Sequence, residues 1–180
     1  GSVECLVLGR RIEKVASDAA SYGLVFSADH PTLANPVADR YARVIADITR
    51  QQTVDLVVAA STTYAKDIIG RAAGLLGGAM ASDVVHHEFH DEQLVLRRPM
   101  FAGAVTATVV LCGHPQIITV RPTAYAAPPR AESPFAITPI AIDNASLPSH
   151  ITFERVESKA SHRPDVTEAR VVVSGGRAIK

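Results

Sequence analysis

Hydrophobic residues follow two different spacings in the first half of the chain. Three continuous apolar runs predict buried strands, at residues 3–8, 24–28 and 54–60. Apolar residues at helical spacing predict helices over 11–23, 36–52 and 61–78. Strands and helices therefore alternate, which predicts an α/β fold with a parallel sheet wrapped by helices.

The second of these helices has the clearest pattern. Asn35 is its predicted N-cap and Pro36 its first residue. One face is apolar and is expected to be buried, namely Val37, Tyr41, Val44, Ile45 and Ile48. The third helix is expected to end at the Gly77-Gly78 pair, because glycine favours the helix C-terminus.

The pattern changes after Asp83. Four strand-like runs follow with no helix between them, at 84–90, 93–100, 103–111 and 116–122, and Asp91–Gln93 reads as a hairpin turn. This half is expected to add antiparallel strands to the sheet or over its edge. A proline-rich stretch then predicts an extended crossing segment over 124–139, and further strands are expected at 150–158 and 170–173.

Composition and charge narrow the class of protein. The hydrophobic content of 47% suffices for a core, and the formal net charge of +0 provides no field that would attract nucleic acid or an anionic membrane. No apolar run reaches the length of a transmembrane helix. Cys5 and Cys112 lie in apolar runs, where buried free thiols are favoured over a disulfide.

Two internal segments could carry chemistry. Ser61, Thr62, Thr63 and Lys66 follow a buried strand and could grip a phosphate, but glycines are missing, so helix capping with a solvated Lys66 is the favoured reading. His86, Glu88 and His90 share one face of a strand and could bind a metal, although an exposed strand face is favoured. No nucleophile motif or carboxylate pair indicates catalysis.

The C-terminal stretch RVVVSGGR is a third candidate. A β-branched run leads into Ser174, Gly175, Gly176 and Arg177. The glycines permit close approach of backbone to a ligand, and Arg177 can pair with a phosphate or an electron-rich ring. Taken alone, the stretch favours a strand that simply ends in a turn.

Several segments together resemble one family, the electron transfer flavoprotein alpha subunits. RPDVTEARVVVSGGR is similar to the junction between that subunit's two domains, and ITVRPTAYAA, RRPMFAGAVTATV, ASTTYAKDIIGRAAGLL, MASDVV and VECLVLG resemble further family segments in the same order. The chain departs from the family pattern at four positions, which are His162, Gly70, Ala104 and Ala178.

The resemblance implies a fold and a role. The fold is a three-layer Rossmann-like sheet, similar to adenine nucleotide alpha hydrolases. With a beta subunit and FAD, the alpha subunit carries electrons from flavin dehydrogenases, such as acyl-CoA dehydrogenases in fatty acid β-oxidation, to a quinone oxidoreductase of the respiratory chain. The domain present here is scaffold and subunit contact, and the protein is a carrier, not an enzyme.

The resemblance also assigns the cofactor residues and the domains. FAD contacts are expected at Arg177, Gly176, Gly175 and Ser174, most FAD contacts lie in the absent C-terminal domain, and AMP is expected only in the beta subunit. Residues 1–165 form the N-terminal domain, which lacks the family's first strand and helix, and 166–180 begin the FAD-binding domain. The expected location is the bacterial cytoplasm, or the mitochondrial matrix in a eukaryote, without membrane insertion.

A second hypothesis rests on the order of elements and on the loop from Ser61 to Lys66. It is a stand-alone adenine-nucleotide-binding module of the universal-stress type. The missing glycine-rich phosphate loop argues against it. A purely structural interaction domain is a third reading.

Overall fold

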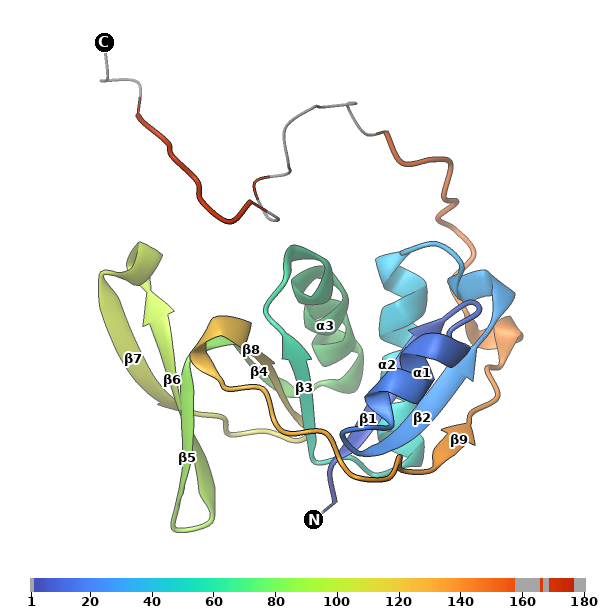
Figure 1. Cartoon of the computed structure of the whole chain (residues 1–180), viewed down its shortest axis with the longest axis horizontal. Helices are drawn as coiled ribbons and strands as arrows, with labels where there is room; N and C mark the ends of the chain where they lie inside the picture. The colour runs from blue at the N-terminus through green and yellow to red at the C-terminus, as the bar shows by residue number, and fades with distance from the viewer. Residues whose placement is uncertain (1, 158–165, 167–168, 177–180) are drawn as a thin grey trace.

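The computed structural model of the chain describes residues 2–157, 166 and 169–176. Helices and strands alternate in the first half, and strands dominate the second half, as predicted (Figure 1). In chain order the main elements are β1 (Glu4–Gly9), α1 (Glu13–Ala19), β2 (Leu24–Asp29), α2 (Ala38–Gln51), β3 (Leu56–Ala60), α3 (Thr63–Leu76), β4 (Ala79–Val84), β5 (His86–His90), β6 (Gln93–Met100), β7 (Val105–Val110), β8 (Gln116–Val120) and β9 (Ile137–Pro139).

The strands form two parallel sheets and one antiparallel sheet. The first parallel sheet has the order β1-β2-β9 and the second the order β3-β8-β4. The expectation that β8 is antiparallel was wrong, because β8 lies between β3 and β4 and runs parallel to both. Its residues Ile117 and Ile118 are both buried, which is the pattern of a strand covered on its two faces.

The antiparallel sheet has the order β5-β6-β7. Its predicted hairpin is confirmed, because His90 pairs with Gln93 across the turn residues Asp91 and Glu92, which both have positive φ. Leu94 and Leu96 on one face of β6 are buried. They form a core cluster with Ala81, Val84 and Ile118, so this sheet packs on the second parallel sheet.

Helices cover the parallel sheets from two sides. Helices α2 and α3 pack together in a core cluster that also contacts alternate residues of β1 and β3, namely Leu6, Leu8, Val57 and Ala59. Helix α1 packs on the other residues of β1, Cys5 and Val7, and therefore lies on the opposite face. The fold is α/β and Rossmann-like, as predicted.

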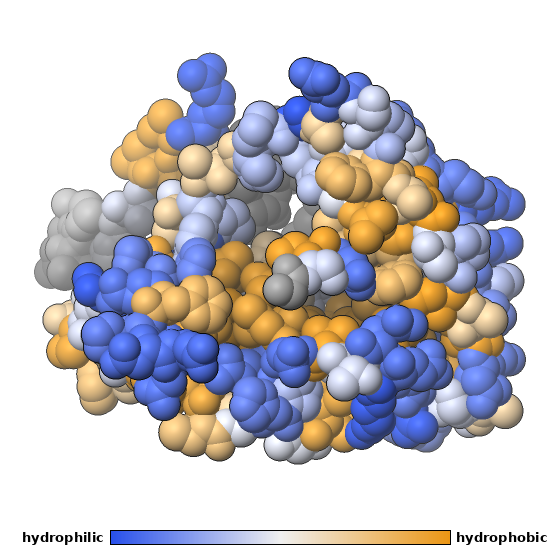
Figure 2. Space-filling view, turned by 90° about the horizontal axis from the view of Figure 1, so that it is seen from below, coloured by the Kyte–Doolittle hydropathy of each residue, from blue (hydrophilic) through white to orange (hydrophobic). Residues whose placement is uncertain are grey.

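The two parallel sheets do not join each other. Among the described residues, β1 pairs with β2 alone and β3 with β8 alone, so each has one unpaired edge. Val58 on β3 is 53% exposed, although its neighbours face the core. Figure 2, seen from below, shows hydrophobic residues gathered in a hollow in the middle of the molecule.

Three local expectations were wrong. Helix α2 begins at Ala38 with Val37 as N-cap, so Asn35 does not cap it and Pro36 precedes it. Residues 150–157 form no strand, although one was expected over 150–158. Val171–Val173 also form no strand, because no described strand pairs with them, and these valines are 53–93% exposed.

The two thiols are free, as favoured, but they differ in burial. Cys5 is half-buried beneath α1, whereas Cys112 lies beyond the end of β7 and is exposed. The expectation that Cys112 is buried was therefore wrong. Within 2–157, 166 and 169–176, no helix is both long and apolar enough to cross a bilayer.

Candidate functional site at the carboxyl edge of the second parallel sheet

The carboxyl ends of β3, β8 and β4 meet at one edge of the second parallel sheet. Ser61 follows β3, Arg121 follows β8, and Asp83 lies near the end of β4. The backbone N–H groups of Ser61 and Arg121 donate to the carbonyl oxygens of Val120 and Val84, at 2.7 and 2.8 Å. Open α/β sheets bind ligands outside this edge, which makes it the first place to search for a site.

A bulge in β4 places Asp83 at this edge. The pairing of β4 with β8 shifts register between Ala81 and Val84, so β4 carries one extra residue there. Asp83 has a φ of +60°, a conformation that aspartate tolerates better than most residues. Its backbone N–H donates to Oγ1 of Thr119 at 3.0 Å, which holds the bulge against β8.

Arg121 and Asp83 form a two-pronged ion pair. Nε of Arg121 donates to Oδ1 of Asp83 at 3.1 Å, and Nη2 donates to Oδ2 at 2.6 Å. These hydrogen bonds are the main reason that the pKa of Asp83 is lowered from its ordinary value, with burial acting in the opposite direction. The nearby charge of Lys66 and a hydrogen bond from Ser61 lower this pKa further.

Two of the hydroxyl groups after β3, those of Ser61 and Thr62, already have partners within the domain. Thr119 is fully buried, and its hydroxyl donates to Oγ of Ser61 at 3.3 Å. Thr62 is the N-cap of α3, and its Oγ1 accepts from the backbone N–H of Ala65 at 3.0 Å. The capping interpretation of this loop is confirmed at Thr62, and Lys66 is exposed as expected.

Arg98 is a further polar group at this edge. It follows the buried Leu94 and Leu96 on the same face of β6, and its Nη2 donates to Oγ of Ser82 at 3.0 Å. Its Nε is buried and has no hydrogen-bond partner among the described residues. Arg98, Arg121 and Asp83 line an open cavity of about 700 Å³ together with the turn at Phe101–Gly103.

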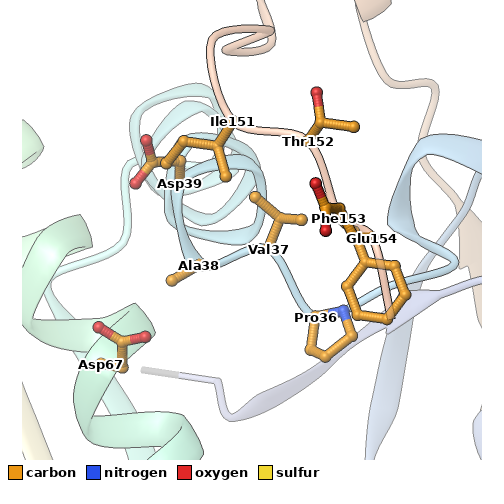
Figure 3. Close-up of a pocket in the computed structure, with 9 residues that line it drawn as sticks. All are labelled: Pro36, Val37, Ala38, Asp39, Asp67, Ile151, Thr152, Phe153 and Glu154. Carbon is orange, nitrogen blue, oxygen red and sulfur yellow. The ribbon is translucent and has the colours of Figure 1, made fainter. Parts of the chain in front are cut away.

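A second cavity, of about 520 Å³, lies at the start of α2 (Figure 3). Asp39 of α2 and Asp67 of α3 line it, with residues 151–154 across from them. Asp39 is 6% exposed, and Nε of Arg71 lies 2.7 Å from its Oδ1. Nε2 of His150 lies 2.9 Å from Oδ2 without a directed hydrogen bond, and Arg71 supplies the permanent positive charge beside this carboxylate.

Residues 148–151 are fastened to α2 beside this cavity. Arg40 donates from Nε to the carbonyl oxygen of Pro148 at 3.3 Å and from Nη2 to that of Ile151 at 3.2 Å. Its Nη1 donates to the carbonyl oxygen of Thr32 at 3.4 Å. The contact with Ile151 occupies one backbone carbonyl of the segment that was expected to form a strand.

The remaining candidates from the sequence lie elsewhere. Ser174, Gly175 and Gly176 belong to an exposed segment without regular structure, and Arg177 lies outside the described residues. The FAD contacts assigned to these four residues stay a prediction.

The histidine-rich strand is the other candidate. His86, Glu88 and His90 lie on β5, all of whose residues are exposed, as the favoured reading expected. In the part of the chain that the structure describes, no three His, Cys, Asp or Glu side chains gather as they would around a metal ion.

Sequence reasoning missed the individual residues of this edge, which are Asp83, Arg98, Thr119 and Arg121. The available signal was a charged residue that continues or ends an apolar run, as in Leu94-x-Leu96-x-Arg98. Four of the segments that carry the family resemblance supply this edge, because they contain Ser61, Asp83, Arg98 and Arg121.

Comparisons with known proteins agree with that resemblance. The family model described as "Electron transfer flavoprotein domain" matches residues 1–143. The electron transfer flavoprotein subunit alpha of Clostridium acetobutylicum is 30% identical, over 97% of this chain and 54% of the relative. The corresponding subunit of Pseudomonas aeruginosa is 32% identical, over 100% of this chain and 57% of the relative. The mitochondrial subunit of Oryza sativa subsp. indica is 31% identical, over 96% of this chain and 50% of the relative. The chain spans about half the length of the curated relatives it matches.

Proposed function

The chain belongs to the electron transfer flavoprotein family, and we propose that it is the N-terminal domain of an alpha subunit. With a beta subunit and FAD, this subunit carries electrons from flavin dehydrogenases, acyl-CoA dehydrogenases among them, to the respiratory chain. The bound flavin supplies the redox chemistry, and the protein orients it and controls access to it. The relatives named above are all alpha subunits of electron carriers, which supports this role.

One observation supports a scaffold role for the domain itself. The polar side chains at the carboxyl edge mostly bind one another, since Arg121 pairs with Asp83 and Thr119 donates to Ser61. A nucleotide site would instead leave backbone and hydroxyl donors free for phosphates. The same observation argues against the stand-alone nucleotide-binding module.

We propose the end of the β6–β7 hairpin as a contact with the beta subunit. Met100, Phe101 and Val105 are apolar and adjoin one another there, with exposed fractions of 38%, 77% and 51%. The turn between β6 and β7 lies at the same end of the molecule as the carboxyl end of β3 (Figure 1). Neighbouring apolar side chains exposed in this way are typical of a protein interface.

We further propose that residues 166–180 begin the FAD-binding domain and that a strand preceding Val3 in the natural subunit lies between β1 and β3. The unpaired edges of β1 and β3 both adjoin the layer of α2 and α3, and the hollow between the sheets is hydrophobic (Figure 2). A strand there would pair both edges and form one continuous parallel sheet. The test compares amide hydrogen exchange at β1 and β3 in the natural subunit with that in the 180-residue chain. Slower exchange in the natural subunit would support this proposal, and equally fast exchange in both would contradict it.

The function is tested by isolating the natural gene product with whatever co-purifies. We expect a chain longer than 180 residues, a second subunit and the absorption bands of flavin. The 180-residue chain by itself is expected to bind FAD weakly or not at all in calorimetry. A colourless natural protein without a second subunit would overturn the proposal, and micromolar binding of AMP or ATP would then favour the nucleotide-binding module.

A further inference from the structure

Arg98 lies on the face of β6 that packs on the core, where apolar residues are expected. Side chains two residues apart share one face of a strand, so Arg98 lies on the same face as Leu94 and Leu96. Both leucines are buried against the second parallel sheet. Arg98 continues this row to the carboxyl edge, where it reaches Ser82 on β4.

The guanidinium of Arg98 lacks a charged partner. Its neighbour Arg97 pairs with Glu88, and Arg121 pairs with Asp83, but Arg98 forms no ion pair within the described residues. Among the residues that the structure describes, its one hydrogen bond goes to the neutral hydroxyl of Ser82, and its buried Nε finds no acceptor. A buried charged donor without an acceptor is costly, so this position favours an acceptor from outside the domain.

The residues that line the cavity beside Arg98 indicate the charge and polarity of an acceptor that would fit there. Arg98 lines a cavity of about 700 Å³ with Asp83 and Arg121, and Lys66 lies close enough to Asp83 to lower its pKa. Two arginines and one carboxylate thus line the cavity, and the carboxylate is already paired with Arg121. Met100 and Phe101 add apolar surface to the same cavity.

We propose that Arg98 is the centre of a binding site for an oxyanion, a carboxylate or phosphate group attached to an apolar body. A planar guanidinium can bind two oxygens of such a group, and among the described residues the guanidinium of Arg98 donates only to the hydroxyl of Ser82. The apolar body would lie on Met100 and Phe101, which are part of the surface proposed above to contact the beta subunit. This inference rests on the contacts of Arg98 and goes beyond the proposed function.

The first test uses the natural subunit and inorganic phosphate, titrated by calorimetry at constant ionic strength. Arg98→Gln removes the charge and is expected to weaken phosphate binding about tenfold or more. Arg98→Lys keeps the charge without the fork of donors and is expected to give an intermediate affinity. The matched control is Arg97→Gln on the same strand, whose exposed pair with Glu88 is expected to leave binding within about twofold.

The second test distinguishes a free anion from a carboxylate of another protein, and it rests on the proposed beta subunit. If the wild-type subunit does not bind phosphate but Arg98→Gln weakens assembly with the beta subunit about tenfold, the oxyanion is a carboxylate of that partner. If the wild-type subunit binds phosphate and Arg98→Gln loses this binding, the ligand of Arg98 is a free anion. If Arg98→Gln changes neither phosphate binding nor assembly, the proposal is wrong, whatever the flavin content of the preparation.

Discussion

The ion pair between Arg121 and Asp83 gives a quantitative test of the candidate site. Asp83→Asn keeps the size of the side chain and its tolerance of positive φ, but removes the charge that Arg121 binds. An exposed ion pair contributes about 0–1 kcal/mol, and a hydrogen bond to a charged group about 1.5–3 kcal/mol. Because the two side chains are 44% and 26% exposed, we expect the variant to lose about 1–2 kcal/mol in the free energy of unfolding.

The assay is urea unfolding of the wild type, Asp83→Asn, Arg121→Gln and the double variant. We expect the double variant to be more stable than the sum of the single changes predicts, by about 1 kcal/mol, since each single change already breaks the same pair. If the effects of the two substitutions add without coupling, the pair does not stabilise the fold and the structural argument fails.

The same series has a defined dependence on pH. The pKa of Asp83 is lowered in the folded state from the ordinary value of 3.8, chiefly by the hydrogen bonds from Arg121. A lowered pKa means that the stabilisation is fully present above 3.8 and is lost as the pH falls through the folded-state pKa. The difference in stability between the wild type and Asp83→Asn should therefore stay constant at pH values well above 3.8 and shrink as the pH falls below 3.8.

Three further predictions concern stability and are measured by the same urea unfolding. Thr62→Ala removes the N-cap of α3 and is expected to cost about 1 kcal/mol. Leu96→Ala empties a fully buried site and is expected to cost about 2–5 kcal/mol, whereas Phe89→Ala, at a side chain 72% exposed, should change little. Gly78→Ala would place a Cβ against the carbonyl oxygen of Pro115 and destabilise, while Gly70→Ala in α3 meets no atom within 4 Å and should stabilise by up to about 1 kcal/mol. Equal effects of the two glycine substitutions, or of Leu96→Ala and Phe89→Ala, would contradict the packing described above.

Elements that depend on local sequence were predicted well. The apolar face of α2 is buried at Val44, Ile45 and Ile48, and α3 ends at Leu76 with Gly77 as its C-cap, at a φ of +64°. The turn at Asp91 and Glu92 lies where its residues indicated. Each of these features is determined by side chains within a few residues, so the pattern along the chain contains the information.

Elements that depend on distant partners could not be predicted in the same way. The sequence of β8 indicates a buried strand, but its place between β3 and β4 depends on segments more than 30 residues away. The run Val171–Val173 has strand composition, yet a strand exists only where a neighbour pairs with it. The site also depends on partners that are distant in the sequence. Arg121 and Asp83 are 38 residues apart, and Thr119 and Ser61 are 58 residues apart.

The contacts at the carboxyl edge link three of the short segments that carry the family resemblance. Asp83 must tolerate a positive φ, donate its N–H to Thr119 and present a carboxylate to Arg121. Thr119 must fit a fully buried position and offer a hydroxyl that accepts from Asp83 and donates to Ser61. Because each residue meets several requirements at once, few other residue types can replace it, and a change in one segment requires a matching change in another. The segments around these residues can therefore resemble those of a family even where the surrounding chain differs from it.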